Sequence, residues 1–181
     1  MFQNLLFTKD GPIAVLQIHR PQKKNSLDAE LRREMEAALR DIGNDTRIKA
    51  AIVTGGTEIF CAGADINEIK ASTSAEDSFH HAREFQRLFD QVESLPQPVI
   101  AAVSGYALGG GCELTLACVY RLATFNDKIR IGLPEVNLGF VPGFGGTYRL
   151  PRMIGLSEGL KTTTVNHKIL PAANGRKPYK K

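Results

Sequence analysis

Short apolar runs along the chain predict β-strands. Residues 5–8 and 13–19 are strand-like runs on either side of Lys9-Asp10-Gly11. An Asp-Gly pair between two such runs is a strong signal for a β-hairpin. Residues 50–54 and 99–103 are continuous apolar runs, a pattern typical of strands that are buried on both faces.

Between these strands, apolar residues recur at helical spacing. The first such segment predicts a helix that Ser26 or Asp28 can cap and that Gly43 can end, with one face formed by Leu27, Leu31, Met35, Leu39 and Ile42. A second amphipathic helix is predicted over about residues 75–95, where two nearby prolines end it. Its apolar positions are Phe79, Ala82, Phe85, Leu88, Phe89 and Val92.

The alternation continues up to about residue 156. Residues 112–118 have the pattern of a helix, and 121–124 and 128–131 that of short strands. Strands and helices that alternate along a chain predict an α/β fold. From residue 157 to 181, prolines, asparagines and a run of threonines leave little periodicity. We therefore expect a core domain over residues 1–156 and a divergent, irregular tail over 157–181.

Charge is distributed unevenly along the chain. The 181 residues carry a formal net charge of +4. Residues 161–181 hold six of the 23 basic residues and no acidic one, which leaves 17 basic against 19 acidic residues elsewhere. The basicity thus belongs to the tail. Such a tail is usually solvated, although it could attract phosphate groups weakly, and we expect no nucleic-acid partner.

Composition places the chain among ordinary globular proteins. No apolar run reaches the roughly 18 residues of a membrane-spanning helix, and the first residues do not have the pattern of a secretory signal. Cys61, Cys112 and Cys118 show no CxxC spacing. We expect reduced core cysteines rather than a disulfide or a metal site, and a reducing, cytoplasmic location.

Two glutamates in glycine-rich segments are the main candidates for chemistry. Glu113 follows Gly109-Gly110-Gly111, and Glu135 precedes a second glycine-rich stretch over residues 139–146. Glycine lets a backbone approach a ligand, and carboxylates at such places suggest proton transfer on a bound small molecule. Structural alternatives exist, because a helix dipole favours Glu113 in any case, Glu135 could cap a short helix, and the triple glycine could be a tight turn.

The segment Phe60 to Ile66 is a candidate partner of the triple-glycine turn, since both follow apolar strand-like residues. One backbone N–H from each segment could converge on an oxygen as an oxyanion hole, in which each donor contributes roughly 10²–10³-fold in rate. A simple turn is an equal alternative, with Asp65 as an N-cap.

Other chemical motifs are weaker. The chain has no GxxxxGK[ST] loop and no GxGxxG followed by a suitably placed acid. His80 and His81 are expected at the surface of the second helix. Ser104 has no GxSxG context, and Cys112 is a less favoured nucleophile.

Taken in order over about residues 2–156, these segments resemble the enoyl-CoA hydratase/isomerase (crotonase) family. The matching motifs are Asn25-Ser26-Leu27, Cys61 to Ile66, Pro98 to Val103, Gly105 to Glu113, and Pro134-Glu135 with Pro142 to Thr147. Together they are specific for the family, although the family hosts several reactions on one scaffold.

The resemblance implies a spiral of ββα units with an acyl-CoA thioester in an interior pocket. The N–H groups of Ala64 and Gly110 would hold the thioester oxygen, and the substrate would contact Ala62, Ala64, Asp65, Ile66, Gly109 and Gly110. Glu113 and Glu135 would hold a water that adds to C3 while a proton goes to C2. Family isomerases often keep only the second glutamate, so the pair favours an enoyl-CoA hydratase of the β-oxidation type, without cofactor or metal.

The resemblance fades after Ile154-Gly155-Leu156. The family usually continues through a C-terminal helical region that covers the pocket and builds homo-oligomers, trimers or hexamers, and we expect this chain to lack most of that region. Three hypotheses follow. The chain hydrates 2-trans-enoyl-CoA, it is an isomerase or another enolate-forming member, or it is a catalytically silent chain that binds CoA esters.

Overall fold

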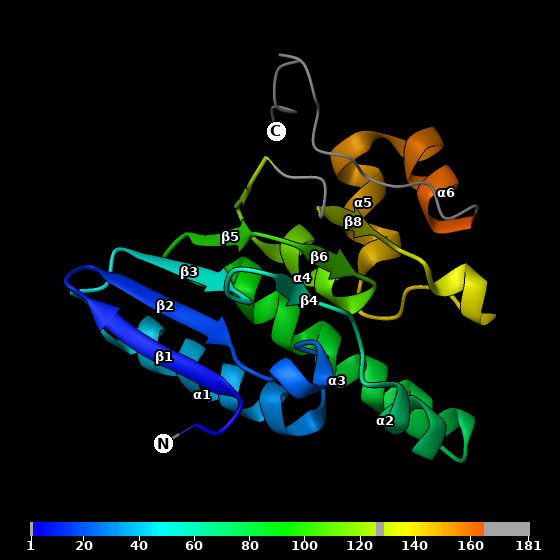
Figure 1. Cartoon of the computed structure of the whole chain (residues 1–181), viewed down its shortest axis with the longest axis horizontal. Helices are drawn as coiled ribbons and strands as arrows, with labels where there is room; N and C mark the ends of the chain where they lie inside the picture. The colour runs from blue at the N-terminus through cyan, green and yellow to red at the C-terminus, as the bar shows by residue number, and fades with distance from the viewer. Residues whose placement is uncertain (1, 126–128, 165–181) are drawn as a thin grey trace.

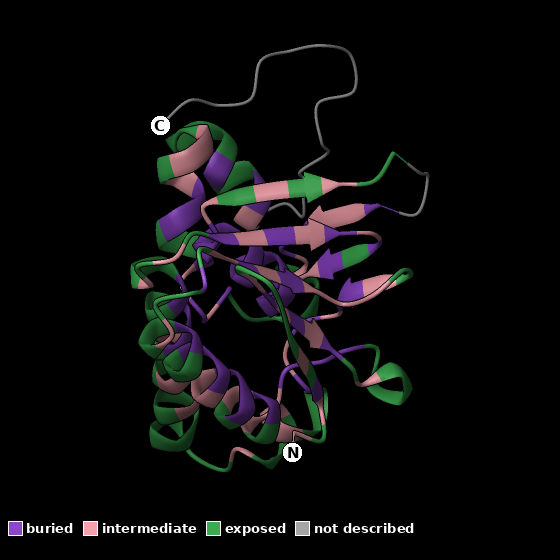
Figure 2. Cartoon of the chain, turned by 90° about the vertical axis from the view of Figure 1, so that its left-hand side faces the viewer, coloured by how far each residue is buried: buried purple, intermediate pink, exposed green. Residues whose placement is uncertain are grey.

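A computed structural model describes residues 2–125 and 129–164 of the protein. The described chain builds a five-stranded sheet and a three-stranded sheet, with helices packed against them (Figure 1). Figure 2 shows that buried residues gather where the strands face the helices, whereas exposed residues cover the outer sides of the helices. The prediction of an α/β fold is confirmed.

The five-stranded sheet begins with the predicted hairpin. Strands β1 (Leu5–Asp10) and β2 (Ile13–Ile18) pair in antiparallel fashion across the Gly11 turn. The strands β3 (Ala50–Thr54), β5 (Val99–Val103) and β7 (Tyr120–Ala123) then join in parallel, in the order β1-β2-β3-β5-β7. The apolar runs therefore predicted the central strands correctly.

The second sheet contains three short parallel strands, which are β4 (Ile59–Cys61), β6 (Tyr106–Leu108) and β8 (Arg130–Gly132). The first two were not predicted, because three residues are too few to show a period. Each repeating unit of the chain places one strand in each sheet and then forms one or two helices. Strands β3 and β4 precede α2 and α3, strands β5 and β6 precede α4, and strands β7 and β8 precede α5. This repetition is the expected spiral of ββα units.

The two long helices agree closely with prediction. Helix α1 (Ala29–Asn44) is capped by Asp28, whose side chain accepts from the N–H of Leu31 at 2.9 Å. Gly43 does not end this helix, which continues to the Asp45 cap, so the predicted end is wrong by one residue. Helix α3 (Ala75–Ser94) buries Phe85, Leu88, Phe89 and Val92, but its Phe79 is exposed.

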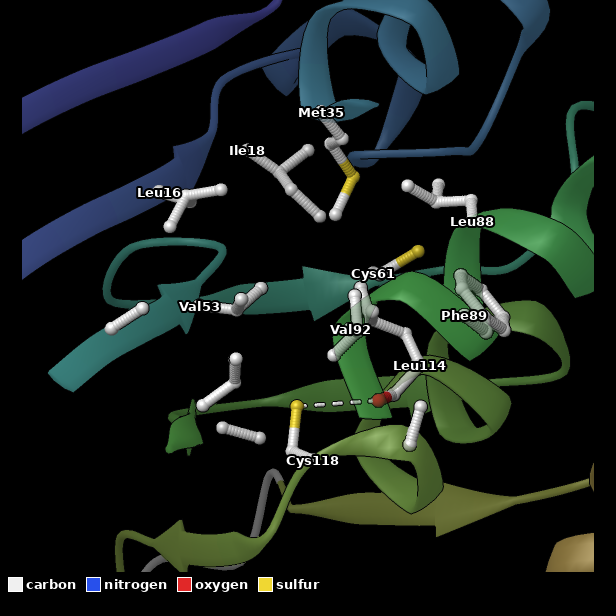
Figure 3. Packing of buried hydrophobic residues seen from close by; sticks show 14 of the residues in the cluster. Leu16, Ile18, Met35, Val53, Cys61, Leu88, Phe89, Val92, Leu114 and Cys118 are labelled. Carbon is white, nitrogen blue, oxygen red and sulfur yellow. Dashed lines mark hydrogen bonds between the residues drawn. The ribbon is translucent and has the colours of Figure 1, made fainter. Parts of the chain in front are cut away.

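Helix α4 (Gly110–Ala117) lies in the middle of the molecule with all eight residues buried. Its Leu114 packs in the main apolar core with side chains from α1, α3 and the strands (Figure 3). Cys118 donates to the Leu114 carbonyl at 3.3 Å. All three cysteines are buried and free, as predicted. A helix buried all round shows no amphipathic period. The sequence predicted this helix over residues 112–118, and the structure begins it two residues earlier, at Gly110.

Three shorter helices complete the described chain: α2 (Ile66–Ala71), α5 (Gly146–Ile154) and α6 (Leu156–Thr164). Two 3-10 turns, η1 (Pro21–Lys23) and η2 (Glu135–Leu138), lie in the loops. None of the described helices combines the length and the apolarity needed to cross a membrane.

The prediction of irregular chain from residue 157 is wrong for residues 157–164, which form most of α6. Gly155, at φ +89°, turns the chain after α5. The hydroxyl groups of Thr162 and Thr163 then donate to carbonyls of the preceding turn, so threonines that disfavour a helix by composition are accommodated within it. Residues 165–181 lie outside the described residues, and the domain boundary at 156 remains a prediction.

Candidate active site

A cavity of about 520 Å³ is lined by the two candidate glutamates and by the residues that the resemblance assigns to substrate binding. Its wall is built by the loop from β4 to α2, the start of α4, η2 and the loop that follows η2. The predicted residues that line it are Ala62, Ala64, Asp65, Ile66, Gly109, Gly110, Glu113 and Glu135. Loops from successive ββα units therefore meet in the wall of this cavity.

Two backbone N–H groups in this wall have no acceptor among the described residues. Leu27 forms a parallel bridge with Ala64. In this bridge the Leu27 N–H donates to the Gly63 carbonyl, and the Leu27 carbonyl accepts from the Asp65 N–H, so the N–H of Ala64 itself is not used. Gly110 is the first residue of α4, where an N–H has no acceptor inside the helix. Among the described residues, neither Ala64 nor Gly110 donates its backbone N–H to another group. The geometry therefore offers two free donors in one cavity.

Glu113 is held inside the protein by a distant loop. The residue is 1% exposed, and its Oε1 atom accepts from the N–H of Phe144 at 2.9 Å and of Gly146 at 2.7 Å. Burial raises the pKa of Glu113 to about 8, and nearby Glu135 also raises it, while the two N–H donors and the Arg149 charge oppose this shift. The hydrogen bonds from Phe144 and Gly146 show that Glu113 does more than stabilise the dipole of its own helix.

Glu135 faces the same cavity from η2. The residue is 6% exposed, and its Oε2 atom is buried without a hydrogen-bond partner among the described residues. Burial raises the pKa of Glu135. The N-cap position of η2 is occupied by Pro134, and Glu135 is the first residue of the turn, so Glu135 is not the cap of this short helix.

Glycines make room for both carboxylates. A Cβ at Gly109, which has φ +52°, would lie 3.0 Å from Oε1 of Glu135, and a Cβ at Gly146 would lie 2.9 Å from Oε1 of Glu113. Gly111 fits the packing alternative instead, since a Cβ there would meet the Cys61 carbonyl at 2.4 Å. The triple glycine therefore serves the cavity at one position and helix packing at another.

Asp65 has a structural role that the sequence left open. Its side chain accepts from the N–H of Asn67 at 3.0 Å, as the N-cap of α2, and from the Ser26 hydroxyl at 3.2 Å. Because these bonds use both carboxylate oxygens, Asp65 shapes the cavity wall. Ile66 is 54% exposed beside it and offers apolar surface at the cavity rim.

Several cavity residues were missed by the sequence analysis. Lys23 and Lys24 line the cavity, where Lys24 has the left-handed φ of +50°. His81 also lines it, half-buried rather than at the open surface as predicted, and its buried Nε2 has no partner among the described residues. The signal that could have found His81 is its helical spacing to Phe85, whose ring it contacts at 5.2 Å between centroids.

Other candidates find no support. Cys112 is fully buried, and burial raises the pKa of its thiol above the ordinary range, which disfavours a nucleophile. His80 is exposed, with 67% of its side chain accessible. The described residues contain no group of three or more His, Cys, Asp or Glu side chains arranged to hold a metal.

Comparison with known proteins identifies the family of the chain. A family model described as "Enoyl-CoA hydratase/isomerase" matches residues 8–174. The chain belongs to the enoyl-CoA hydratase/isomerase family. A solved family member, an enoyl-CoA hydratase from Bacillus anthracis, is 37% identical with a TM-score of 0.85, over 92% of this chain and 64% of that chain.

Curated members of the family are also similar. The short-chain-enoyl-CoA hydratase of Clostridium acetobutylicum is 44% identical over 158 residues, which are 84% of this chain and 58% of the relative. The crotonyl-CoA hydratase of Syntrophomonas wolfei is 43% identical over 159 residues, 85% of this chain and 58% of the relative. The chain therefore spans somewhat more than half the length of these family members.

Proposed function

We propose that the chain is an enoyl-CoA hydratase, which adds water to a 2-trans-enoyl-CoA thioester and yields 3-hydroxyacyl-CoA. The observation that carries the proposal is the placement of two buried carboxylates, Glu113 and Glu135, in one cavity with the free N–H groups of Ala64 and Gly110. The names of the similar curated proteins support a short enoyl chain.

The two N–H groups supply the electrostatic part of the reaction. When the oxygen of water bonds to C3, the electrons of the double bond move toward the thioester and its oxygen gains negative charge. Hydrogen bonds from Ala64 and Gly110 would stabilise that enolate. Because each N–H has no competing acceptor in the described chain, both are free to bind this oxygen.

The two glutamates would divide the proton transfers. Burial raises both pKa values, and the Glu135 charge raises that of Glu113 further, so the pair retains a proton at neutral pH. One carboxylate accepts a proton from the attacking water, and the other carboxyl group donates a proton to C2. The product gains the elements of one water molecule. The two glutamates together accept one proton from water and donate one to C2, so their net charge is unchanged.

The remaining cavity residues would bind the CoA part of the substrate. Lys23 and Lys24 bring positive charge to the cavity that Ala62 and Ile66 also line, where negatively charged phosphates would be attracted. The proposal needs no further cofactor, because water and the thioester contain every reacting atom. It includes a reducing, cytoplasmic location, which three free cysteines support.

Self-association is part of the proposal. The sequence predicted a homo-oligomer, a trimer or hexamer, and exposed apolar side chains near the end of the described chain support contact with a second copy. These are Leu138 at 62%, Val141 at 71%, Leu156 at 66% and Leu160 at 50% exposure. Sedimentation velocity of the purified chain would show species of defined size, and a monomer at every concentration would contradict this part.

The test is hydration of crotonyl-CoA, followed by loss of the absorbance of the enoyl thioester. We expect the wild-type chain to be active and Glu113→Gln and Glu135→Gln each to lose on the order of 10²–10⁴-fold in rate. Glutamine keeps the shape of the side chain and the Oε1 acceptor of Glu113, so folding should survive. Inactive wild-type protein with an intact circular dichroism spectrum would overturn the proposal and favour a silent CoA-ester-binding chain.

The same variants separate a hydratase from an isomerase. An isomerase that relies on Glu135 alone would keep much of its activity in Glu113→Gln, measured as conversion of a 3-enoyl-CoA to the 2-enoyl isomer. The two free N–H donors serve either reaction. The burial of both carboxylates in one cavity favours the hydratase.

A further inference from the structure

Arg149 of α5 is a buried cation outside the cavity. Its side chain is only 6% exposed, and it pairs with two acids of α3, Asp90 at 2.6 Å and Glu93 at 3.0 Å. Those acids are 65% and 57% exposed, so the ion pairs reach from the interior to the surface. Arg149 does not line the cavity, and none of the sequence motifs singled it out.

The same guanidinium reaches the loop that holds Glu113. Its Nη1 atom donates to the carbonyl of Phe144 at 3.3 Å, while the N–H of Phe144 donates to Glu113 at 2.9 Å. A Cβ at Gly145, which has φ +106°, would lie 2.3 Å from the same Nη1. The loop is therefore wrapped closely around the guanidinium on one side and around the Glu113 carboxylate on the other.

Helix α3 fastens the loop by two further contacts. The Gln86 side chain donates to the Gly143 carbonyl at 2.7 Å, and the Phe85 ring stacks on the Phe144 ring at 4.4 Å between centroids. One face of α3 thus contacts the loop directly and, through Asp90 and Glu93, orients the arginine that also contacts it. The backbone N–H groups that fix Glu113 depend on this arrangement.

We propose that Arg149 is a positioning residue, which holds the Phe144–Gly146 loop in place. The backbone N–H groups of Phe144 and Gly146 in that loop then set the orientation of the Glu113 carboxylate. The inference rests on the proposed hydration for its catalytic consequence, but its structural consequence can be measured without turnover. A buried arginine that bridges exposed acids to a loop carbonyl is suited to this task, because its planar guanidinium donates in several fixed directions.

Arg149 also affects the charge state of Glu113. Among the described residues, the charged groups that shift the pKa of Glu113 are Glu135 of η2 and Arg149 of α5. Among these groups, Arg149 is the one that lowers the pKa of Glu113. Removal of the arginine would therefore change both the position of the carboxylate and the pH at which it ionises.

The first experiment measures amide hydrogen exchange by NMR for Phe144 and Gly146. We expect both to exchange about tenfold or more faster in Arg149→Met and in Asp90→Asn/Glu93→Gln, with the amides of Leu39 and Val53 in the distant core unchanged. The matched control is Glu76→Gln/Glu84→Gln, which removes two acids of the same helix that do not contact Arg149: exposed Glu76, and half-buried Glu84, which pairs with Arg32 instead.

Unchanged exchange in the Asp90/Glu93 variant, or an increase that is equal throughout the protein, would overturn the inference. The Asp90→Asn/Glu93→Gln variant tests the inference even where Arg149→Met does not fold. An equal effect in the Glu76/Glu84 control would also overturn it, since general charge loss on α3 would then be the cause.

The second experiment follows crotonyl-CoA hydration against pH. Arg149→Met and Arg149→Lys should both lower kcat about 10–100-fold with KM within about twofold, because a misplaced carboxylate slows the reaction rather than binding. The limb of the pH profile that titrates Glu113 should move to higher pH in Arg149→Met and stay in place in Arg149→Lys, which keeps the charge. A rise in KM at constant kcat would contradict a positioning role, whereas an inactive wild type with the expected exchange pattern would count against the hydration proposal alone.

Discussion

At the scale of single residues, each candidate glutamate is matched by a glycine across the cavity wall. Gly146 donates its N–H to Glu113 at 2.7 Å and also leaves the room in which that carboxylate lies. Gly109 leaves the room around Glu135, while its own N–H donates to the Gly132 carbonyl at 2.9 Å. A buried carboxylate is tolerated only where donors or a shared proton offset the loss of water. These glycines therefore belong to the chemistry of the site as much as to its turns.

Gly146→Ala should damage activity far more than stability. The new Cβ would lie 2.9 Å from both Cγ and Oε1 of Glu113, so the carboxylate must move by a few tenths of an ångström or more. We expect crotonyl-CoA hydration to fall by about 10²-fold, with a urea midpoint close to that of the wild type. The control is Gly43→Ala, whose Cβ meets Leu95 at an ordinary 3.5 Å. Equal activity in the two variants would show that Glu113 does not need its present position.

At the scale of elements, the loop before α1 fastens the cavity wall to the sheet. Asn25 is 5% exposed, with a left-handed φ of +56°, and its Nδ2 donates to the carbonyls of Gly55 at 2.9 Å and Ile59 at 2.8 Å. The next residues form the bridge between Leu27 and Ala64. Asparagine is among the few residues that accept a left-handed backbone easily, which explains why the motif has this residue at this place.

Asn25→Ala should destabilise the fold by about 2–4 kcal/mol. The substitution removes the donor of two partly buried hydrogen bonds and places alanine at a positive φ. Urea unfolding measures the change, with exposed Asn67→Ala as a control expected to stay within about 0.5 kcal/mol. A loss below about 1 kcal/mol would mean that the loop is held by its other contacts.

At the scale of the whole molecule, the spiral places the site at a cost in stability. Repetition of the ββα unit brings the loop after β4, the start of α4 and the turn after β8 to one cavity. Two carboxylates are buried there, and burial raises both pKa values. Folding must therefore take up or retain protons that an unfolded chain would release, so the stability of the whole fold is linked to the site.

The stability of the wild type should fall relative to Glu113→Gln as pH rises from 4.5 to about 8. An unfolded glutamate ionises near the ordinary pKa of 4.5, whereas folded Glu113 keeps its proton up to about 8. Between these values the folded state binds more protons, so the free energy of unfolding decreases with pH. Urea unfolding at several pH values measures the gap, with exposed Glu76→Gln as control. A gap that is constant or moves in the opposite direction would show that Glu113 is ionised in the folded protein.

Much of the fold could be predicted because its signals are local. The runs at 50–54 and 99–103 are long enough to show buried strands, and the period of α1 and α3 is carried by apolar side chains of one face. The three-residue strands β4 and β6 have no measurable period, and α6 is hidden by threonines whose hydroxyl groups bond to the preceding turn. Local pattern fails where an element is too short or is held mainly by its neighbours.

The sequence by itself determined the α/β class, the hairpin and long helices, and the two glutamates with their glycine turns, since residue type and spacing express these directly. Only the tertiary structure decided that Glu113 and Glu135 share one cavity, that Asp65 is used as a cap, and that His81 lies in the wall. It alone brought Arg149 behind the loop that holds Glu113. Such contacts join segments that are dozens of residues apart, and their geometry depends on how the successive ββα units pack.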